Sequence, residues 1–161
     1  MGCKQNAKPL LDAEMKKGAM QEKEVNNITV AVAYMPSCRQ HADASQSGAA
    51  GGEEMTFRVN VHSRDNSRPL HVSEKDNYSY GIDSLFSLVI NTDTVPALYA
   101  HKVANGNLGG IEYLVSFRKD QVERTSSLAL LFRDWLFTST LLRFNYNRNL
   151  LDKVDSLSCS I

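Results

Sequence analysis

The feature that most constrains the fold is a series of short segments in which apolar and polar residues alternate, separated by residues that favour turns. In the clearest segment Phe57, Val59 and Val61 alternate with polar residues as far as His62, and residues 111–117 repeat the pattern. Side chains two residues apart share one face of a strand, so each segment predicts a β-strand with one buried face. Long amphipathic helices do not separate the segments, which favours an antiparallel sheet over a parallel α/β arrangement.

About seven strands of this kind are expected between residues 28 and 146, and residues 83–90 fit either a strand or a short helix. Near the C-terminus an apolar helix face is formed by Leu150, Leu151, Val154 and Leu157, with Asp152 and Asp155 exposed. The prediction is an all-β, antiparallel immunoglobulin-like β-sandwich over residues 28–161, with a short C-terminal helix that closes one end.

Residues 1–27 have a different composition from the rest of the chain. They are rich in Lys, Glu and Asp, and Gly18 interrupts the short stretch that begins at Leu10. Such a segment has little apolar surface with which to offset the entropy of ordering it. We therefore expect a disordered polar tether that ends at Asn27.

The charge balance excludes some partners. Lys and Arg number 18 and Asp and Glu number 18, so no net positive field attracts nucleic acid. Nothing in the sequence calls for a cofactor. Of the three cysteines, Cys38 and Cys159 could be bridged if the first and last elements are neighbours, or they could be unrelated thiols. Both readings stay open at this point.

One group of residues has the chemistry of a metal site. Cys38 and His41 form a C-x-x-H pair, and His62 and His71 are the other histidines near them in sequence. Thiolate and imidazole are ligands that zinc prefers, so these four residues define an alternative hypothesis, a small metal-dependent hydrolase. The simpler interpretation is that they are polar residues on loops and on a solvent-facing strand.

Aromatic residues give a second candidate site. Tyr78, Tyr80, Tyr99 and Trp135 combine a large contact area with a polar group, as residues at binding surfaces often do. Trp135 follows a pair of charged residues, Arg133 and Asp134, for which a partly buried ion pair with another strand is the structural alternative. We expect some of these aromatics to form a solvent-facing ligand patch, with Trp135 the leading member, and the others to lie in the core.

The N-terminus carries a family resemblance. Gly2 is followed by Asn6 where myristoylation would need Ser or Thr, so that pattern fails. Gly2-Cys3-Lys4 followed by a polar stretch resembles the mature start of a small bacterial lipoprotein, although the apolar segment that should precede the cysteine is absent. Residues 85–146, with Asp93-Thr94 and segments 112–117 and 131–134, are similar in rhythm to immunoglobulin-like domains of such lipoproteins.

The resemblance implies that Cys3 carries a lipid anchor and that the chain sits in the bacterial cell envelope, in the periplasm or at the cell surface. The leading hypothesis is a non-enzymatic binding or structural module that holds a protein or glycan partner. The alternatives are the metal-dependent hydrolase and a cytoplasmic interaction domain in which Cys3 is an ordinary thiol.

Overall fold

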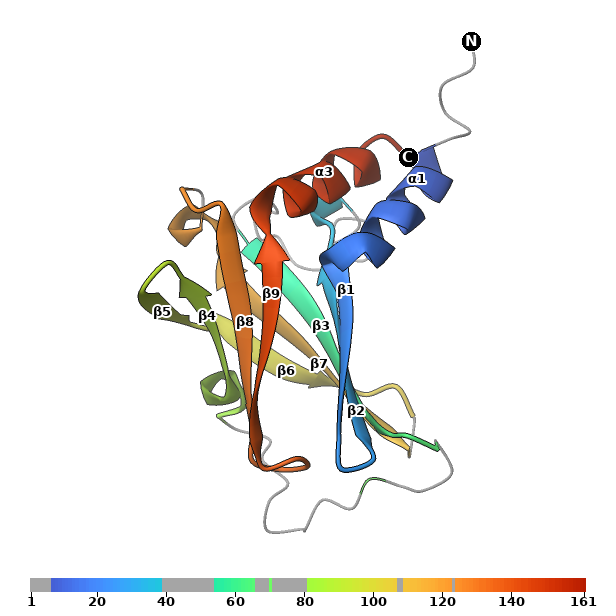
Figure 1. Cartoon of the computed structure of the whole chain (residues 1–161), viewed down its shortest axis with the longest axis vertical. Helices are drawn as coiled ribbons and strands as arrows, with labels where there is room; N and C mark the ends of the chain where they lie inside the picture. The colour runs from blue at the N-terminus through green and yellow to red at the C-terminus, as the bar shows by residue number, and fades with distance from the viewer. Residues whose placement is uncertain (1–6, 39–53, 66–69, 71–80, 107–108, 123) are drawn as a thin grey trace.

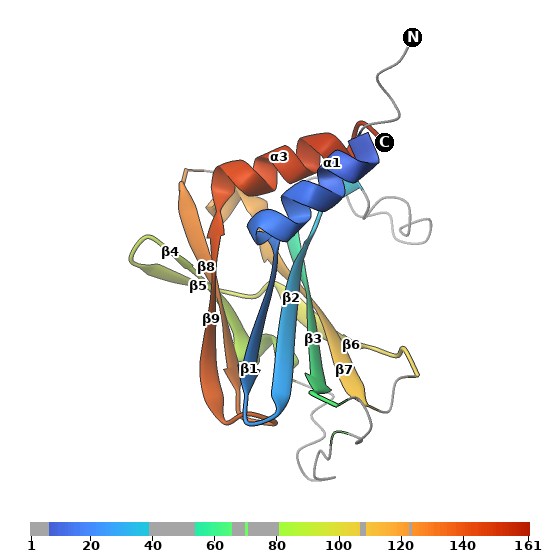
Figure 2. The same cartoon turned by 45° about the vertical axis from the view of Figure 1, so that its right-hand side comes forward.

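The computed structural model describes residues 7–38, 54–65, 70, 81–106, 109–122 and 124–161. Two antiparallel sheets pack face to face, and two helices lie side by side across one end of them (Figures 1 and 2). The elements are α1 (Ala7–Glu14), a π-helical turn (Met15–Ala19), β1 (Met20–Val25), β2 (Ile28–Met35), β3 (Glu54–Ser63), a 3-10 turn (Ile82–Leu85), β4 (Phe86–Ile90), β5 (Asp93–Pro96), β6 (Tyr99–Val103), β7 (Gly110–Arg118), a second 3-10 turn (Lys119–Gln121), β8 (Ser127–Asp134), β9 (Thr140–Asn147) and α3 (Arg148–Ser158).

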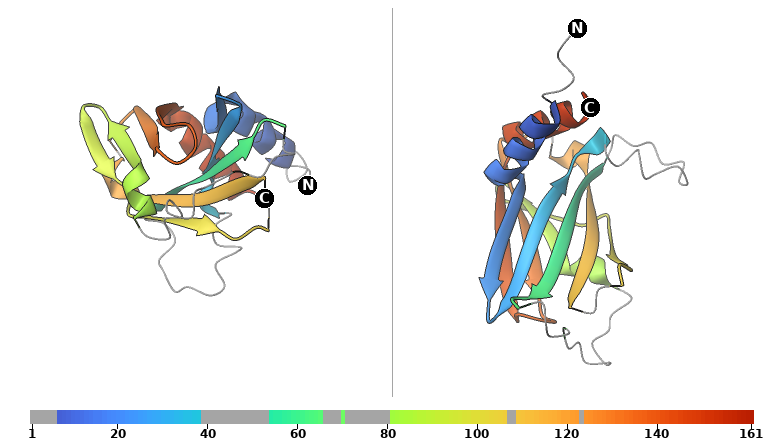
Figure 3. Two further views of the ribbon diagram at one scale, coloured as in Figure 1. Left: turned by 90° about the horizontal axis from the view of Figure 1, so that it is seen from below. Right: turned by 90° about the vertical axis from the view of Figure 1, so that its right-hand side faces the viewer.

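The strand order confirms the immunoglobulin-like sandwich. One sheet has the order β1-β2-β3-β7-β6 and the other the order β5-β4-β8-β9. Strands β2, β3, β7 and β6 correspond to A, B, E and D of an immunoglobulin domain, and β5, β4, β8 and β9 to C′, C, F and G. Strand β1 is an addition at the edge beside A. Figure 3 shows the five-stranded sheet from its outer side. The described residues thus form nine strands rather than about seven.

The core lies between the sheets and follows the predicted alternation. Phe57 of β3 is fully buried and packs against Phe117 and Tyr146, with ring centroids 6.2 and 5.1 Å away. Phe86 of β4 stacks on Phe132 of β8 at 4.6 Å. Offset and edge-on aromatic pairs add to the stability that burial alone provides. Every long strand therefore contributes inward-facing aromatic or aliphatic residues at a spacing of two.

The prediction of a disordered tether ending at Asn27 is wrong for residues 7–27. Leu11 and Ala19 are buried, and β1 pairs with β2 along its whole length. The turn between these strands is Asn26-Asn27, both with positive φ (50° and 65°). Two consecutive residues of this conformation make the two-residue turn that matches the twist of a hairpin. Residues 7–27 are therefore part of the folded domain.

The structure shows the form of residues 83–90 and of the predicted C-terminal helix. Residues 83–90 contain both alternatives, because a 3-10 turn precedes strand β4. The C-terminal helix is confirmed as α3, with Leu151 and Val154 buried against the core. It begins where the side chain of Asn147 accepts a hydrogen bond from the backbone N–H of Leu150, which supplies the helix N-cap.

Candidate functional site

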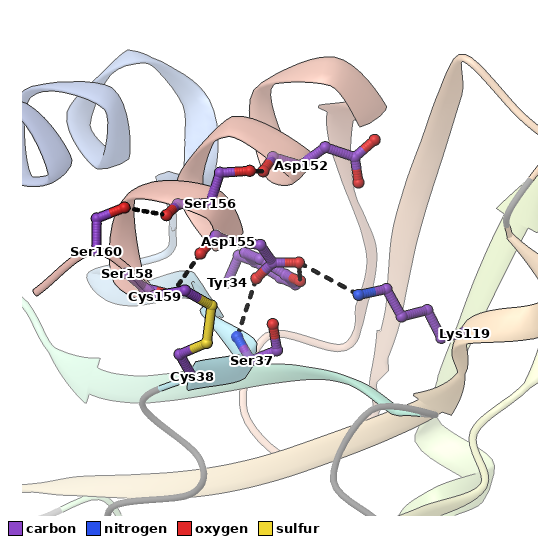
Figure 4. The surroundings of a disulfide bond; sticks show 10 residues. All are labelled: Tyr34, Ser37, Cys38, Lys119, Asp152, Asp155, Ser156, Ser158, Cys159 and Ser160. Carbon is purple, nitrogen blue, oxygen red and sulfur yellow. Dashed lines mark hydrogen bonds and ion pairs between the residues drawn. A yellow bond between two sulfur atoms is a disulfide. The ribbon is translucent and has the colours of Figure 1, made fainter.

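The helical end of the sandwich is held by a disulfide bond. Cys38, just after β2, is bonded to Cys159, just after α3, with the two Cα atoms 5.2 Å apart (Figure 4). The bond joins residues 121 positions apart in sequence. Of the two readings that the sequence left open for these cysteines, the structure therefore has the bridge.

Asp155 of α3 forms a hydrogen-bonded cluster beside the disulfide (Figure 4). Its carboxylate accepts hydrogen bonds from the Tyr34 hydroxyl and the Ser37 backbone N–H, both at 2.9 Å, and Lys119 Nζ lies 3.4 Å away. Burial, and then the charge of Asp155, raise the pKa of Tyr34 far above its ordinary value, so this hydroxyl stays protonated and donates. The expectation that Asp155 is exposed is wrong, because the end of β2 covers it.

A second carboxylate joins the two helices. Glu14, at the end of α1, is almost fully buried, and its Oε1 lies 2.7 Å from Lys17 Nζ and 2.8 Å from Lys153 Nζ of α3. Hydrogen bonds from Lys153 and Lys17 hold the pKa of Glu14 below its ordinary value of 4.5. Leu150 of α3 also lies close to Gly18, where a Cβ atom would sit 3.1 Å from Leu150 Cδ2. These contacts explain why a polar segment folds.

The structure does not assemble the metal site of the alternative hypothesis. Cys38 cannot supply a thiolate ligand, because its sulfur is bonded to Cys159. His62 pairs with Thr29 at one end of β2, whereas Cys38 follows the other end, about 20 Å away at the rise of a strand. His41 and His71 lie outside the described residues. No group of three His, Cys, Asp or Glu that could hold a metal occurs within the described ranges.

The opposite end of the sandwich presents Trp135, which is 63% exposed, in the hairpin between β8 and β9. The preceding residue, Asp134, is fully buried, and among the described residues it does not form the ion pair considered for it. Its carboxylate instead accepts hydrogen bonds from the backbone N–H groups of Leu136, Phe137 and Thr138 at 3.2, 3.0 and 2.9 Å. Phe137 packs on the core. A buried carboxylate thus fixes the loop that carries the exposed tryptophan.

Of the other predicted aromatics, Tyr99 does not join Trp135. Tyr99 is 41% exposed, but it starts β6 on the other sheet, where its hydroxyl donates to Glu54 and its ring stacks 6.1 Å from His101. Tyr78 and Tyr80 lie outside the described residues, as does Cys3. Trp135 is therefore the member of the predicted patch that the structure places, exposed, at a loop of the sandwich.

A shallow hollow of about 290 Å³ lies on the outer face of the five-stranded sheet. Its floor is Ala31 and Ala33 of β2, whose small side chains leave a gap between the longer side chains of β1 and β3. Arg58 at its border is paired with Glu112, 3.0 Å away. The bordering side chains are Lys16, Met20, Gln21, Glu22, Arg58 and Asn60. The hollow holds no arrangement of nucleophile and base.

Comparisons with known proteins give a fold neighbour and no family. No family model matches the sequence, and no curated protein matches it. The crystal structure of a DUF4426 family protein from Pseudomonas aeruginosa PAO1 is similar, with a TM-score of 0.47, 14% sequence identity, and coverage of 81% of this chain and 93% of that chain. No helix in the described part of the chain is long and apolar enough to cross a membrane.

Sequence reasoning missed the three carboxylates that organise the two ends, Glu14, Asp134 and Asp155. Asp134 had a local signal, because an aspartate at the end of a strand commonly accepts hydrogen bonds from the backbone N–H groups that follow it. Asp155 had none, since Tyr34 is 121 residues away in sequence, and for Glu14 only the pairing with Lys17 is local, whereas Lys153 is 139 residues away.

Proposed function

We propose that this chain is a non-enzymatic binding module of the bacterial cell envelope, anchored through a lipid on Cys3 and holding a protein or glycan partner. The observation that carries the proposal is the disulfide between Cys38 and Cys159. Disulfides form and persist in oxidising compartments and are rare in the cytosol. The bond therefore favours export over the cytoplasmic alternative, and it leaves Cys3 as the third cysteine of the sequence.

The buried carboxylates support a role without catalysis. A catalytic acid or base needs a free position beside a substrate. Asp134 accepts hydrogen bonds from three backbone N–H groups, Asp155 is bound by Tyr34, Ser37 and Lys119, and Glu14 by two lysines. All three stabilise the ends of the sandwich. An exposed tryptophan on a fixed loop fits binding better.

The position of α1 sets how the module would sit on the membrane. Four residue steps separate Cys3 from Ala7, where α1 begins, and they span at most about 14 Å. A lipid on Cys3 would hold the helical end against the bilayer. Strand β9 leads from the Trp135 hairpin directly into α3 over eight residues, or about 26 Å. The hairpin would therefore point away from the membrane.

Metabolic labelling with radioactive palmitate, in the native host and from the native gene, tests the proposal. We expect label on the wild-type protein, none on Cys3→Ser, and resistance of Cys38 and Cys159 to thiol-specific alkylation in intact cells in both. The Cys3→Ser variant is the matched control, because it keeps the disulfide. An unlabelled protein whose Cys38 and Cys159 react as free thiols would establish the cytoplasmic alternative.

A further inference from the structure

The hairpin end combines cationic and apolar groups on one surface. Strand pairing places Arg133 beside Leu141 and Leu131 beside Arg143 on the outer side of the four-stranded sheet, where Leu131 is buried and the other three residues are exposed. Leu141 is 52% exposed, and Trp135, the residue that follows the end of β8, is 63% exposed. We call Arg133, Trp135, Leu141 and Arg143 the Arg-Trp face.

The outward strand positions of this sheet, all within the described residues, carry two arginines and no carboxylate. Its remaining outward positions are apolar or uncharged: Thr94, Pro96, Ser87, Val89, Ser127, Ala129, Leu131, Asn145 and Asn147. Asp83 and Asp93 flank the sheet, in the turn before β4 and at the start of β5. Arg143 donates to Asn145, and Arg133 has no ion-pair partner among the described residues. In a chain of zero net charge, this is a local excess of positive charge.

The other sheet has the opposite character. The outward positions of β1, β3 and β7 carry four glutamates, Glu22, Glu24, Glu54 and Glu112, against two arginines, Arg58 and Arg118, so this face has an excess of negative charge. The two faces of the sandwich are thus electrostatically distinct although the charges of the whole chain cancel. An acidic surface would be attracted to the Arg-Trp face and repelled by the opposite one.

The geometry of the hairpin prepares Trp135 for binding. The three hydrogen bonds to Asp134 and the hydrogen bond from Thr140 Oγ1 to the Thr138 carbonyl, 2.9 Å, fix the loop before any partner arrives. Ordering a loop on binding costs affinity, and this loop is already ordered. Tryptophan and arginine are the residues most enriched among the dominant contacts of protein interfaces.

We infer that the Arg-Trp face docks an acidic protein partner. Trp135 and Leu141 enter an apolar pocket of that partner, and the guanidinium groups of Arg133 and Arg143 pair with carboxylates at its rim, which match their planar donor geometry. The choice of a protein over an anionic lipid surface rests on the proposed function, because an anchor on Cys3 turns this face away from the anchoring membrane. The F–G hairpin, which β8 and β9 correspond to, also lies at the binding end of immunoglobulin variable domains.

Selection from a displayed library of random linear peptides tests this inference. The protein, biotinylated at Cys3 with its disulfide intact, is the bait, and affinities of chosen peptides follow from the fluorescence of Trp135, the single tryptophan. We expect the selected peptides to be acidic with apolar residues, and each affinity to fall at least about tenfold when salt is raised and their carboxylates are replaced by amides. Isothermal titration of Trp135→Ala and Arg133→Glu should show a loss of about tenfold or more.

Tyr99→Ala, an exposed aromatic on the other sheet, is the matched control and should bind as the wild type does. Basic or uncharged selected peptides, or peptides that bind Trp135→Ala normally, would overturn the inference. Three other results would also overturn it. A blue shift of Trp135 emission on phosphatidylglycerol vesicles would assign a lipid surface, and saturable binding of chitin oligosaccharides would assign a glycan. Self-association that Trp135→Ala abolishes would assign a second copy of the chain. These results do not depend on palmitate labelling of Cys3, so the anchor and the docking face can fail separately.

Discussion

The two ends of the sandwich use buried carboxylates in different ways. At the helical end Glu14 and Asp155 bind partners far away in sequence, and the disulfide joins β2 to α3, so several segments become one body. At the hairpin end Asp134 binds only the next few residues, and the result is a local loop that exposes Trp135. The same chemical group closes one end and prepares the other end for contact.

Removing the disulfide should give the largest difference in stability between the two ends. The double variant Cys38→Ser with Cys159→Ser loses the constraint on a long loop in the unfolded chain, which is worth about 2–5 kcal/mol. We expect urea denaturation to show this loss, and hydrogen exchange to show α3 exposed while the β8–β9 hairpin stays protected. Cys3→Ser is the control and should leave stability unchanged. Equal loss of protection at both ends would contradict the distinction.

The next effect should come from the hairpin. Asp134→Ala leaves three backbone N–H groups without their acceptor, at a cost of about 1–3 kcal/mol. Trp135 fluorescence anisotropy should fall because the loop loosens, with α3 protection retained. Asp134→Asn keeps an acceptor and should lie between the wild type and Asp134→Ala. A change confined to α3 would show that the hairpin does not depend on this carboxylate.

A smaller effect should appear on acidification at the helical end. The pKa of Glu14 is lowered in the folded protein, so its contribution to stability is complete above the ordinary value of 4.5 and is lost as the pH falls through the lower folded value. Thermal melts should therefore show a fall in midpoint below about pH 4.5 that Glu14→Gln largely removes. A hydrogen bond from Arg118 also lowers the pKa of Asp120, so the Glu14→Gln variant should keep a small dependence of the melting midpoint on pH. The Asp120→Asn substitution removes that remaining dependence and so measures it.

The smallest effect on stability should come from the largest exposed side chain. Most of the Trp135 side chain is exposed to solvent, so Trp135→Ala should change the free energy of unfolding by no more than about 0.5 kcal/mol. Truncating a buried aromatic such as Phe57 should instead cost about 3–5 kcal/mol. Urea denaturation of the two variants gives the comparison. A large loss for Trp135→Ala would mean that this residue is structural.

The sequence predicted most of the sandwich because strand periodicity is a local property. The alternation of Phe57, Val59 and Val61 with polar residues predicts a strand with one buried face. Only a few architectures bury the apolar faces of several such strands at once. The same periodicity did not predict the structure of residues 7–25, because α1 and β1 have few apolar side chains. The Asn26-Asn27 turn was the signal for β1, but a turn alone does not distinguish a hairpin from a linker.

The candidate site was predictable in part. The residue type of Trp135 and its place near the late strands pointed to a contact role, whereas the hydrogen bonds that fix its loop became clear only from the burial of Asp134. The alternative metal site loses Cys38, because Cys38 is in the disulfide and follows the end of β2 that lies opposite His62.

The sequence by itself determined the alternation of side chains, hence the strands, the two-layer sandwich and the apolar face of α3, because these depend on spacings within a few residues. Only the tertiary structure decided that the polar residues 7–27 fold, that Cys38 pairs with Cys159, and that Trp135 faces solvent. Each of these depends on groups brought together from distant parts of the chain: Lys153 on Glu14, Asp155 on Tyr34, and the packed sheets that bury Asp134 and leave its neighbour outside.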